Sequence, residues 1–187
     1  DTTVGKEHFV QKTEYLDEKL LAYSQTDAYP FHMPGHKRQS MGNWTGEAID
    51  ITEITGFDNL HHAEGILQEA QCRAAETFGA DETFFLINGS TAGLLSAICG
   101  TVRRGGRLLM ARNCHKAVYH AVYLMELKTA YLYPEQTDFG IQGSISPEQV
   151  RDMLVQYPDT EAVLLTSPTY DGVVSDIAAI AALAHEK

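Results

Sequence analysis

The sequence is poor in cysteine, in basic residues and in long apolar runs, and each shortage excludes a class of protein. Its three cysteines, Cys72, Cys99 and Cys114, form no CxxC pair, so neither a disulfide framework nor a zinc site is expected. Asp and Glu outnumber Lys and Arg by 25 to 14, which disfavours nucleic acid and anionic membranes as partners. No stretch approaches the roughly 20 apolar residues that span a bilayer, and the N-terminus lacks the features of a signal peptide. We therefore expect a cytoplasmic protein without a metal site, whose partner is a small molecule, a cation or another protein.

Helical and apolar patterns alternate along most of the 187 residues. Continuous apolar runs separated by helices are typical of a mainly parallel sheet covered on both faces. The predicted fold class is therefore α/β, with three layers. Strands are predicted at residues 83–87, 107–111, 129–134 and 162–167, and helices around 15–25 and at 64–78, 91–102, 116–127 and in the last stretch, 175–187.

Two of the predicted helices carry more specific signals. The helix at 64–78 has an apolar side formed by Ile66, Leu67, Ala70, Ala74 and Phe78. Another helix is predicted to begin in "SPEQV", with Ser146 as its cap, Pro147 in its first turn and Gln149 as the capping-box partner.

The turn after the first predicted strand has the composition of a phosphate site. Gly89 allows a close backbone approach, and Ser90 and Thr91 offer hydroxyl and amide groups at the start of a helix whose dipole favours an anion. A Ser or Thr cap after a strand is also a common structural device. Because the chain contains neither GxxxxGK[ST] nor GxGxxG, the phosphate is not expected to belong to a nucleotide.

The ends of the later strands deliver further polar residues to the same edge of the sheet, where ligands bind in open α/β folds. His115, in "RNCHK", could present its ring face to a flat heteroaromatic ligand. A histidine in such a loop is also often purely structural, and Cys114 is expected to be a buried, inert thiol. The last strand is followed by "TSPTYDG".

Five ordered blocks together carry a family resemblance that covers the chain from about residue 15 onward. The chain resembles the major domain of the pyridoxal-phosphate-dependent ornithine/lysine/arginine decarboxylases, which have the fold of aspartate aminotransferase. The blocks are "FHMPGHKR", "DITEITGFDNLHHAEGILQEAQ", "AAETFGADETFFLINGSTAGLLSAI", "RNCHKAVYHAV" and "LLTSPTYDGVVSDI".

The resemblance implies a role for each matching residue. Gly89, Ser90 and Thr91 would hold the phosphate of pyridoxal phosphate, His115 would be the catalytic residue that stacks on its ring, and Thr169 would line the cofactor wall. Tyr170 would line the substrate side. The "HMPGHK" loop is expected near a dimer interface and the active-site entrance, with His32, Gly35, His36 and Lys37 as candidates, although a Pro-Gly turn with solvated basic residues is an equally good interpretation.

Two residues that the family's chemistry requires do not occur in matching segments here. These are the lysine that bonds to the cofactor aldehyde and the aspartate that keeps the pyridine nitrogen protonated. Lys116, Asp171 and Asp176 are not expected to replace them. The resemblance thus implies an N-terminal helix and entrance loop at residues 1–45, and at 46–187 a large domain truncated before the lysine.

The implied activity is decarboxylation of arginine, lysine or ornithine by the full-length protein, giving an amine of polyamine biosynthesis and carbon dioxide. A homodimer or higher homo-oligomer is implied as well. The fragment alone is expected to be inactive. Two alternatives stay open: an aminotransferase or lyase of the same fold, and a noncatalytic fragment that binds a phosphate.

Overall fold

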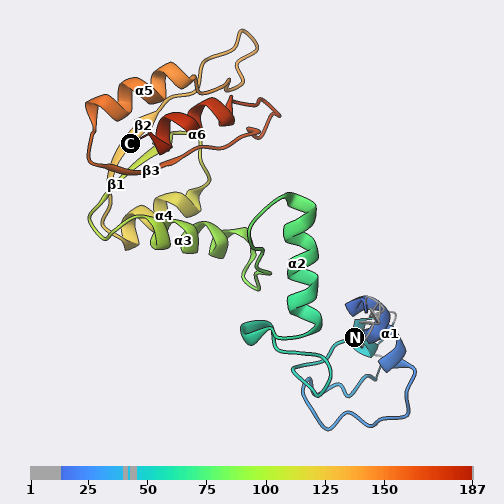
Figure 1. Ribbon diagram of the computed structural model, residues 1–187. Helices are drawn as coiled ribbons and strands as arrows, with labels where there is room; N and C mark the ends of the chain where they lie inside the picture. Colours follow the sequence, from blue (N-terminus) through green and yellow to red (C-terminus); the bar gives the residue numbers. More distant parts are fainter. Residues whose placement is uncertain (1–13, 40–41, 43–45, 187) are drawn as a thin grey trace, which may run out of the picture. The chain divides into compact units, whose positions relative to one another are not determined.

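The computed structural model describes residues 14–39, 42 and 46–186, and it divides into two compact units (Figure 1). Unit 1 extends to Phe85, and unit 2 runs from Leu86 to the C-terminus. A length of 187 residues predicts one globular unit, whereas the chain forms two. The predicted boundary between residues 45 and 46 lies inside unit 1 and stays a prediction about the family's organisation. No helix in the described ranges has the length and apolar character needed to cross a bilayer.

Unit 2 is built on a parallel sheet of three strands in the order β2-β1-β3. The strands are β1 (Arg107–Ala111), β2 (Lys128–Leu132) and β3 (Thr160–Leu164). The central strand, β1, pairs in parallel with both neighbours, from Arg107↔Lys128 to Ala111↔Leu132 on one side and through Leu109↔Val163 on the other. The prediction of a parallel sheet is confirmed.

Helices cover both faces of this sheet, as Figure 1 shows. On one face, α3 (Gly89–Thr101) and α4 (Lys116–Leu124) pack with Leu108 and Met110 of β1. On the other face, α5 (Pro147–Gln156) and α6 (Ile177–His185) pack with Leu109 and Ala111. Because successive residues of a strand point to opposite faces, β1 is apolar on both sides and almost fully buried. The three-layer α/β architecture is therefore confirmed.

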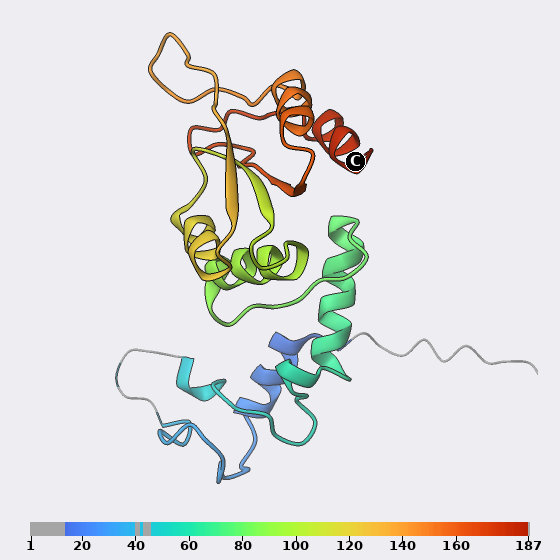
Figure 2. The same cartoon turned by 90° about the vertical axis from the view of Figure 1, so that its left-hand side faces the viewer.

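The segment between β2 and α5 projects as a long loop in both views (Figures 1 and 2). An isolated antiparallel bridge joins Gln136 to Gln142 across it, and Phe139 near its tip is 90% exposed.

The segment 83–87 is not a strand, which contradicts the prediction. It pairs with no strand in the described part of the chain, and four of its side chains are exposed: Phe84, Phe85, Leu86 and Ile87. An apolar run predicts burial, but a strand forms only where a neighbouring strand accepts and donates the ladder hydrogen bonds. The turn at Gly89 therefore follows an extended segment and does not follow a sheet strand.

Helix ends in unit 2 differ from the predicted ones by a few residues. Helix α3 begins at Gly89 and not at 91, so Ser90 and Thr91 belong to its first turn, and α4 ends at Leu124. Ser146 caps α5 as predicted, because its hydroxyl accepts from the Gln149 amide at 3.2 Å. The capping-box role of Gln149 is wrong, since its side-chain amide donates to the Tyr133 carbonyl at 3.1 Å.

In its described residues, unit 1 has two helices and two short 3-10 turns. Helix α1 (Leu16–Ser24) and helix α2 (Ile66–Phe78) are separated by a long connection that includes the 3-10 turns Gly46–Ala48 and Leu60–His62. Gly79 ends α2 in the left-handed conformation, with φ 64°. Ile66 and Ala75 are buried. Phe78, which was predicted on the apolar side of α2, is 82% exposed and does not pack within this unit.

One carboxylate organises the connection that leads into α2. The two oxygens of Asp58 accept backbone N–H bonds from Asn59, Glu64, Gly65 and Leu67 at 2.8 to 3.1 Å. Burial opposes the ionisation of Asp58, but these hydrogen bonds outweigh it and hold the pKa of the carboxyl well below its usual range.

Candidate cofactor site

The first turn of α3 contains the residues that the sequence predicts to form an anion site. Gly89 has φ 65°, which a residue with a side chain rarely adopts, and the space around its α-carbon is open. Asn88 is the N-cap residue, but its side chain makes no cap hydrogen bond, whereas side chains cap α4, α5 and α6. Ser90 and Thr91 are exposed residues of the same turn. These groups could donate hydrogen bonds to a phosphate.

His115 caps the helix next to α3. Its Nδ1 accepts a hydrogen bond from the Ala117 backbone N–H at 3.2 Å, and the residue is exposed. Helices α3 and α4 lie side by side on one face of the sheet (Figure 1). Because α4 begins directly after β1 and α3 ends directly before it, the first turns of both helices face the carboxyl ends of the strands. The structure thus brings these predicted residues to the same edge.

Thr169 and Tyr170 follow β3 at the same edge but differ sharply in exposure. Thr169 is buried and closes a turn with Val173. Its hydroxyl accepts from the Val173 amide at 3.1 Å, and its own amide donates to the Val173 carbonyl at 2.8 Å. The hydroxyl proton of Thr169 is still available for donation. Tyr170 is fully exposed at the tip of the turn. The cofactor role of Thr169 and the substrate role of Tyr170 stay predictions.

The predicted entrance residues are held by contacts within unit 1. His32 Nε2 lies 3.2 Å from the Tyr23 hydroxyl, and Lys37 Nζ donates to the His32 carbonyl. His36 Nε2 lies within hydrogen-bond distance of Asp50 Oδ2, at 3.2 Å. Lys37 also has a positive φ of 54°, an unusual backbone conformation for a lysine. These contacts give the loop a structural role, and its role at an active-site entrance stays a prediction.

Sequence reasoning did not single out the residues around His115. Asn113 has a buried Oδ1 that accepts no hydrogen bond from any residue in the described ranges. The Cys114 thiol has its pKa raised by burial, which keeps it protonated, as expected of an inert thiol. Arg112 and Tyr119 bond to each other across the same turn. Their spacing in "RNCHKAVY" carries no motif, so only coordinates could reveal the pairing.

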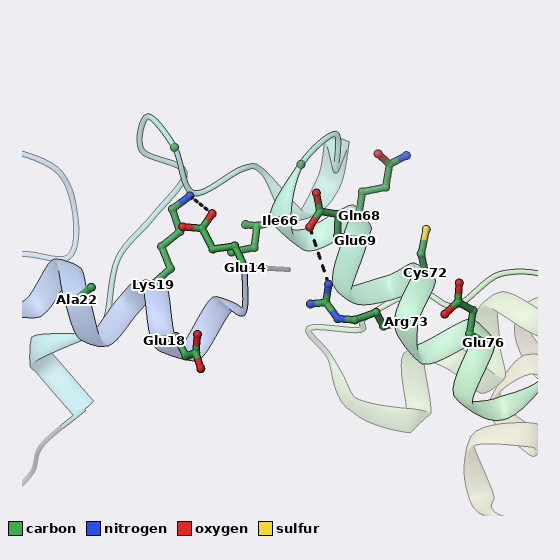
Figure 3. A pocket seen from close by; sticks show the side chains of 12 residues that line it. Glu14, Glu18, Lys19, Ala22, Ile66, Gln68, Glu69, Cys72, Arg73 and Glu76 are labelled. Carbon is green, nitrogen blue, oxygen red and sulfur yellow. Dashed lines mark hydrogen bonds and ion pairs between the residues drawn. The ribbon is translucent and has the colours of Figure 1, made fainter. Parts of the chain in front are cut away.

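A hollow of about 960 Å³ lies between α1 and α2 of unit 1 (Figure 3). Figure 3 shows Lys19 reaching Glu14 and Arg73 reaching Glu69, at 2.8 and 3.9 Å. None of the predicted site residues lines this groove. Charged side chains make up half of its lining, and four of them form the two pairs named above. The predicted cofactor residues lie in unit 2, at the carboxyl ends of its strands.

Comparison with known families decides the assignment. Residues 15–187 match the family model described as "Orn/Lys/Arg decarboxylase, major domain". The chain belongs to this family. The resemblance read from the five sequence blocks is thereby confirmed.

Individual members of the Orn/Lys/Arg decarboxylase family show the same relationship. The chain is 35% identical to an arginine decarboxylase of Bacillus cereus, over 89% of this chain and 38% of that protein. It is 28% identical to the lysine decarboxylase LdcA of Pseudomonas aeruginosa, over 82% of this chain and 24% of that protein. The solved constitutive lysine decarboxylase of Escherichia coli aligns with a TM-score of 0.71 and 25% identity, over 84% of this chain and 25% of that one. The chain thus spans well under half the length of these relatives.

The α3 turn fits the phosphate of the cofactor that this family implies. A phosphate needs donors and positive potential, and the turn offers uncapped amides, two hydroxyls and the positive end of a helix dipole. The open space at Gly89 leaves room for a group to approach the backbone. His115 adds a flat ring at the start of the neighbouring helix.

Proposed function

We propose that the complete protein containing this chain is a pyridoxal-phosphate-dependent decarboxylase of a basic amino acid. The reaction converts arginine, lysine or ornithine into the corresponding amine and carbon dioxide. Membership of the Orn/Lys/Arg decarboxylase family supports the reaction class. The single observation in this chain that carries the proposal is the uncapped first turn of α3, with Gly89 in the left-handed conformation beside two hydroxyl residues.

The residues of unit 2 have distinct tasks in this proposal. The amides and hydroxyls of Ser90 and Thr91 bind the phosphate and fix one end of the cofactor. The imidazole of His115 packs on the ring face and holds its plane. Thr169 and Tyr170 form part of the wall on the side of β3. The bound cofactor supplies an electron sink for the electron pair that remains when the carboxylate leaves, and the protein supplies alignment.

The substrate stays open among the three basic amino acids. Relatives named arginine decarboxylase and lysine decarboxylase are both similar to this chain, at 35% and 28% identity. A net charge of −11 suits a cationic substrate, although it does not locate the residues that recognise the distal group. We further propose a cytoplasmic homo-oligomer that acts in polyamine biosynthesis. The isolated 187-residue chain should be inactive, because it contains no segment that resembles the family's cofactor-binding lysine segment.

A product assay on the complete protein tests the reaction class. Arginine, lysine and ornithine are each supplied with pyridoxal phosphate, and released carbon dioxide and keto acid are both measured. Carbon dioxide with a stoichiometric amine is the expected result. Keto acid in place of carbon dioxide would assign an aminotransferase and overturn the proposal.

Two substitutions test the cofactor site itself. Ser90→Ala and Thr91→Ala should each raise the dissociation constant of pyridoxal phosphate roughly 10- to 100-fold, the size expected for a lost hydrogen bond to a charged group. The matched control is Ser96→Ala, because Ser96 is an exposed serine further along α3. Cofactor absorbance and fluorescence give the constants. An affinity equal to that of the control in both variants would show that the phosphate lies elsewhere.

A further inference from the structure

We infer that Tyr119 and Arg112 form a brace that positions the His115 ring. This inference rests on the proposed function for its consequence at the cofactor, although the brace itself is a feature of the chain. Arg112 lies one residue beyond β1, His115 precedes α4, and Tyr119 lies one helical turn after His115. The brace therefore ties the first turn of α4 back to the end of the central strand.

The Tyr119 hydroxyl joins the two sides of the brace. It donates to the Arg112 carbonyl at 2.9 Å and accepts from Nη1 of the same arginine. The guanidinium also lies 5.4 Å from the centroid of the Tyr119 ring and 5.5 Å from that of Tyr131 in β2. A planar guanidinium can donate hydrogen bonds and stack on aromatic faces together, which a lysine cannot do.

The arginine is in turn anchored to the sheet. Its backbone N–H donates to the Leu132 carbonyl at 2.8 Å, which links the ends of β1 and β2. The Cys114 amide donates to the Ala111 carbonyl at 3.2 Å and closes the turn that leads to His115. Ala111, Arg112 and Cys114 thus each take part in a backbone hydrogen bond of this turn, and Tyr119 holds the turn from the helix side.

Protonation states favour a permanent brace. Burial raises the pKa of the Tyr119 phenol, so the hydroxyl keeps the proton that it donates to Arg112. Arg112 forms no ion pair with an acidic side chain in the described part of the chain, so no salt bridge competes for its guanidinium.

The brace matters because it holds the helix turn whose backbone amide bonds to the His115 ring. Nδ1 accepts from the Ala117 amide, so Nδ1 carries no proton and the neutral ring has its proton on Nε2. That cap bond requires residues 115 to 117 to keep their backbone course, and Tyr119 fixes the same turn of α4 to the strand end. Loss of the brace should loosen the cap bond and let the ring populate other orientations and the other tautomer.

The test measures the His115 ring directly in the complete protein without cofactor. Histidine is labelled with nitrogen-15, and the His115 signals are identified by their loss in a His115→Gln variant. At alkaline pH, where imidazoles are neutral, the parent should show an unprotonated Nδ1 and a protonated Nε2. Tyr119→Phe keeps the ring beneath Arg112 but removes both hydroxyl bonds, and it should shift these signals toward the other tautomer.

A second variant and a control separate positioning from general stability. Arg112→Lys keeps the positive charge but loses the planar donor, and it should move the same His115 signals. Tyr123→Phe removes a hydroxyl from an 84% exposed tyrosine of the same helix and should leave them unchanged. If the His115 signals of both Tyr119→Phe and Arg112→Lys match those of the parent, the brace does not position the ring and the inference is overturned.

Cofactor affinity then measures the functional consequence. Tyr119→Phe should weaken the binding of pyridoxal phosphate about fivefold, the effect of losing roughly one hydrogen bond's worth of positioning. A parent protein that binds no cofactor would overturn the proposed function while the nitrogen-15 signals still decide the brace. A variant with altered His115 signals but parental affinity would show that the brace sets the ring without serving the cofactor, and would overturn the functional half of the inference.

Discussion

The two units of the chain are each stabilised internally, and by different kinds of interaction. In unit 2, the central strand β1 is buried on both faces, and two apolar clusters join it to four helices. In unit 1, the long connection between α1 and α2 is fixed mainly by polar contacts. Asp58 accepts four backbone hydrogen bonds, and Arg38 donates to the Tyr23 carbonyl at 2.9 Å while lying 4.7 Å from the centre of its ring.

This difference teaches where each unit is vulnerable. Apolar burial is spread over many residues of unit 2. The free energy of unfolding of this unit should therefore fall when buried volume is lost, and change little when one surface charge is removed. Hydrogen bonds to a single carboxylate are concentrated, so unit 1 should respond strongly to one substitution at the right place. Hydrogen exchange by mass spectrometry can follow the two units separately through peptides that cover α2 and β1.

The largest effect is expected from Leu109→Ala in β1. Leu109 is completely buried, and its truncation should lower the free energy of unfolding of unit 2 by about 3 kcal/mol through lost burial and a residual cavity. The matched control, Leu124→Ala, changes a leucine of α4 that is 54% exposed and should cost less than about 0.5 kcal/mol. Urea unfolding with exchange of the β1 peptides measures both. Similar losses in the two variants would mean that β1 is not the core of this unit.

A somewhat smaller effect is expected from Asp58→Asn, and it should appear in unit 1. The amide has one acceptor oxygen in place of two, so its nitrogen would face backbone N–H groups that now lack a partner. We expect a loss of roughly 2 kcal/mol in the protection of the α2 amides. Asp27→Asn is the control, because Asp27 is exposed in the same unit. Unchanged protection in Asp58→Asn would show that the connection is held by other contacts.

The same carboxylate predicts a pH dependence. Burial opposes ionisation of Asp58 and the four N–H bonds favour it, with the net result that its pKa in the folded protein is depressed. A depressed folded pKa contributes stability above the unfolded value of about 3.9 and loses it as the pH falls below that value. Protection of α2 should therefore decline below about pH 4 in the parent and decline less in Asp58→Asn. Parallel declines would exclude Asp58 as the titrating group.

The fold of unit 2 was predictable because its segments repeat one pattern. The strand at Arg107–Ala111 was placed correctly at both ends, since an apolar run between two helical patterns has one reasonable interpretation. The segment 83–87 has an equally apolar pattern but forms no strand, because pairing depends on a neighbour that its own residues do not encode. The hydrogen bonds of Asp58 were not predictable, since they join a side chain to amides up to nine residues away in an irregular loop.

Only those features of the candidate site that depend on neighbouring residues in the sequence, such as the turn at Gly89, were predictable. Gly89 before two hydroxyl residues at a helix start is compatible with an anion site and equally with an ordinary helix cap, and the positive φ of Gly89 agrees with a tight turn there. The brace from Tyr119 to Arg112 depends on how far α4 turns back over the strand end, which only tertiary packing determines. The same is true of Thr169, whose buried hydroxyl closes its own turn.

The smallest effect concerns two glycines of α3 and should stay within unit 2. Gly100 lies in the last turn of α3 with open space around it, so Gly100→Ala should stabilise unit 2 by about 0.5 kcal/mol through a lower backbone entropy of the unfolded chain. Gly89→Ala places the same methyl group at φ 65° and should cost about 1 kcal/mol, because an alanine is strained there. Exchange of the α3 peptides gives both values, and the α2 peptides serve as the internal control. Stabilisation by both substitutions would mean that the turn at Gly89 relaxes without cost, in which case it could not be a preformed phosphate seat.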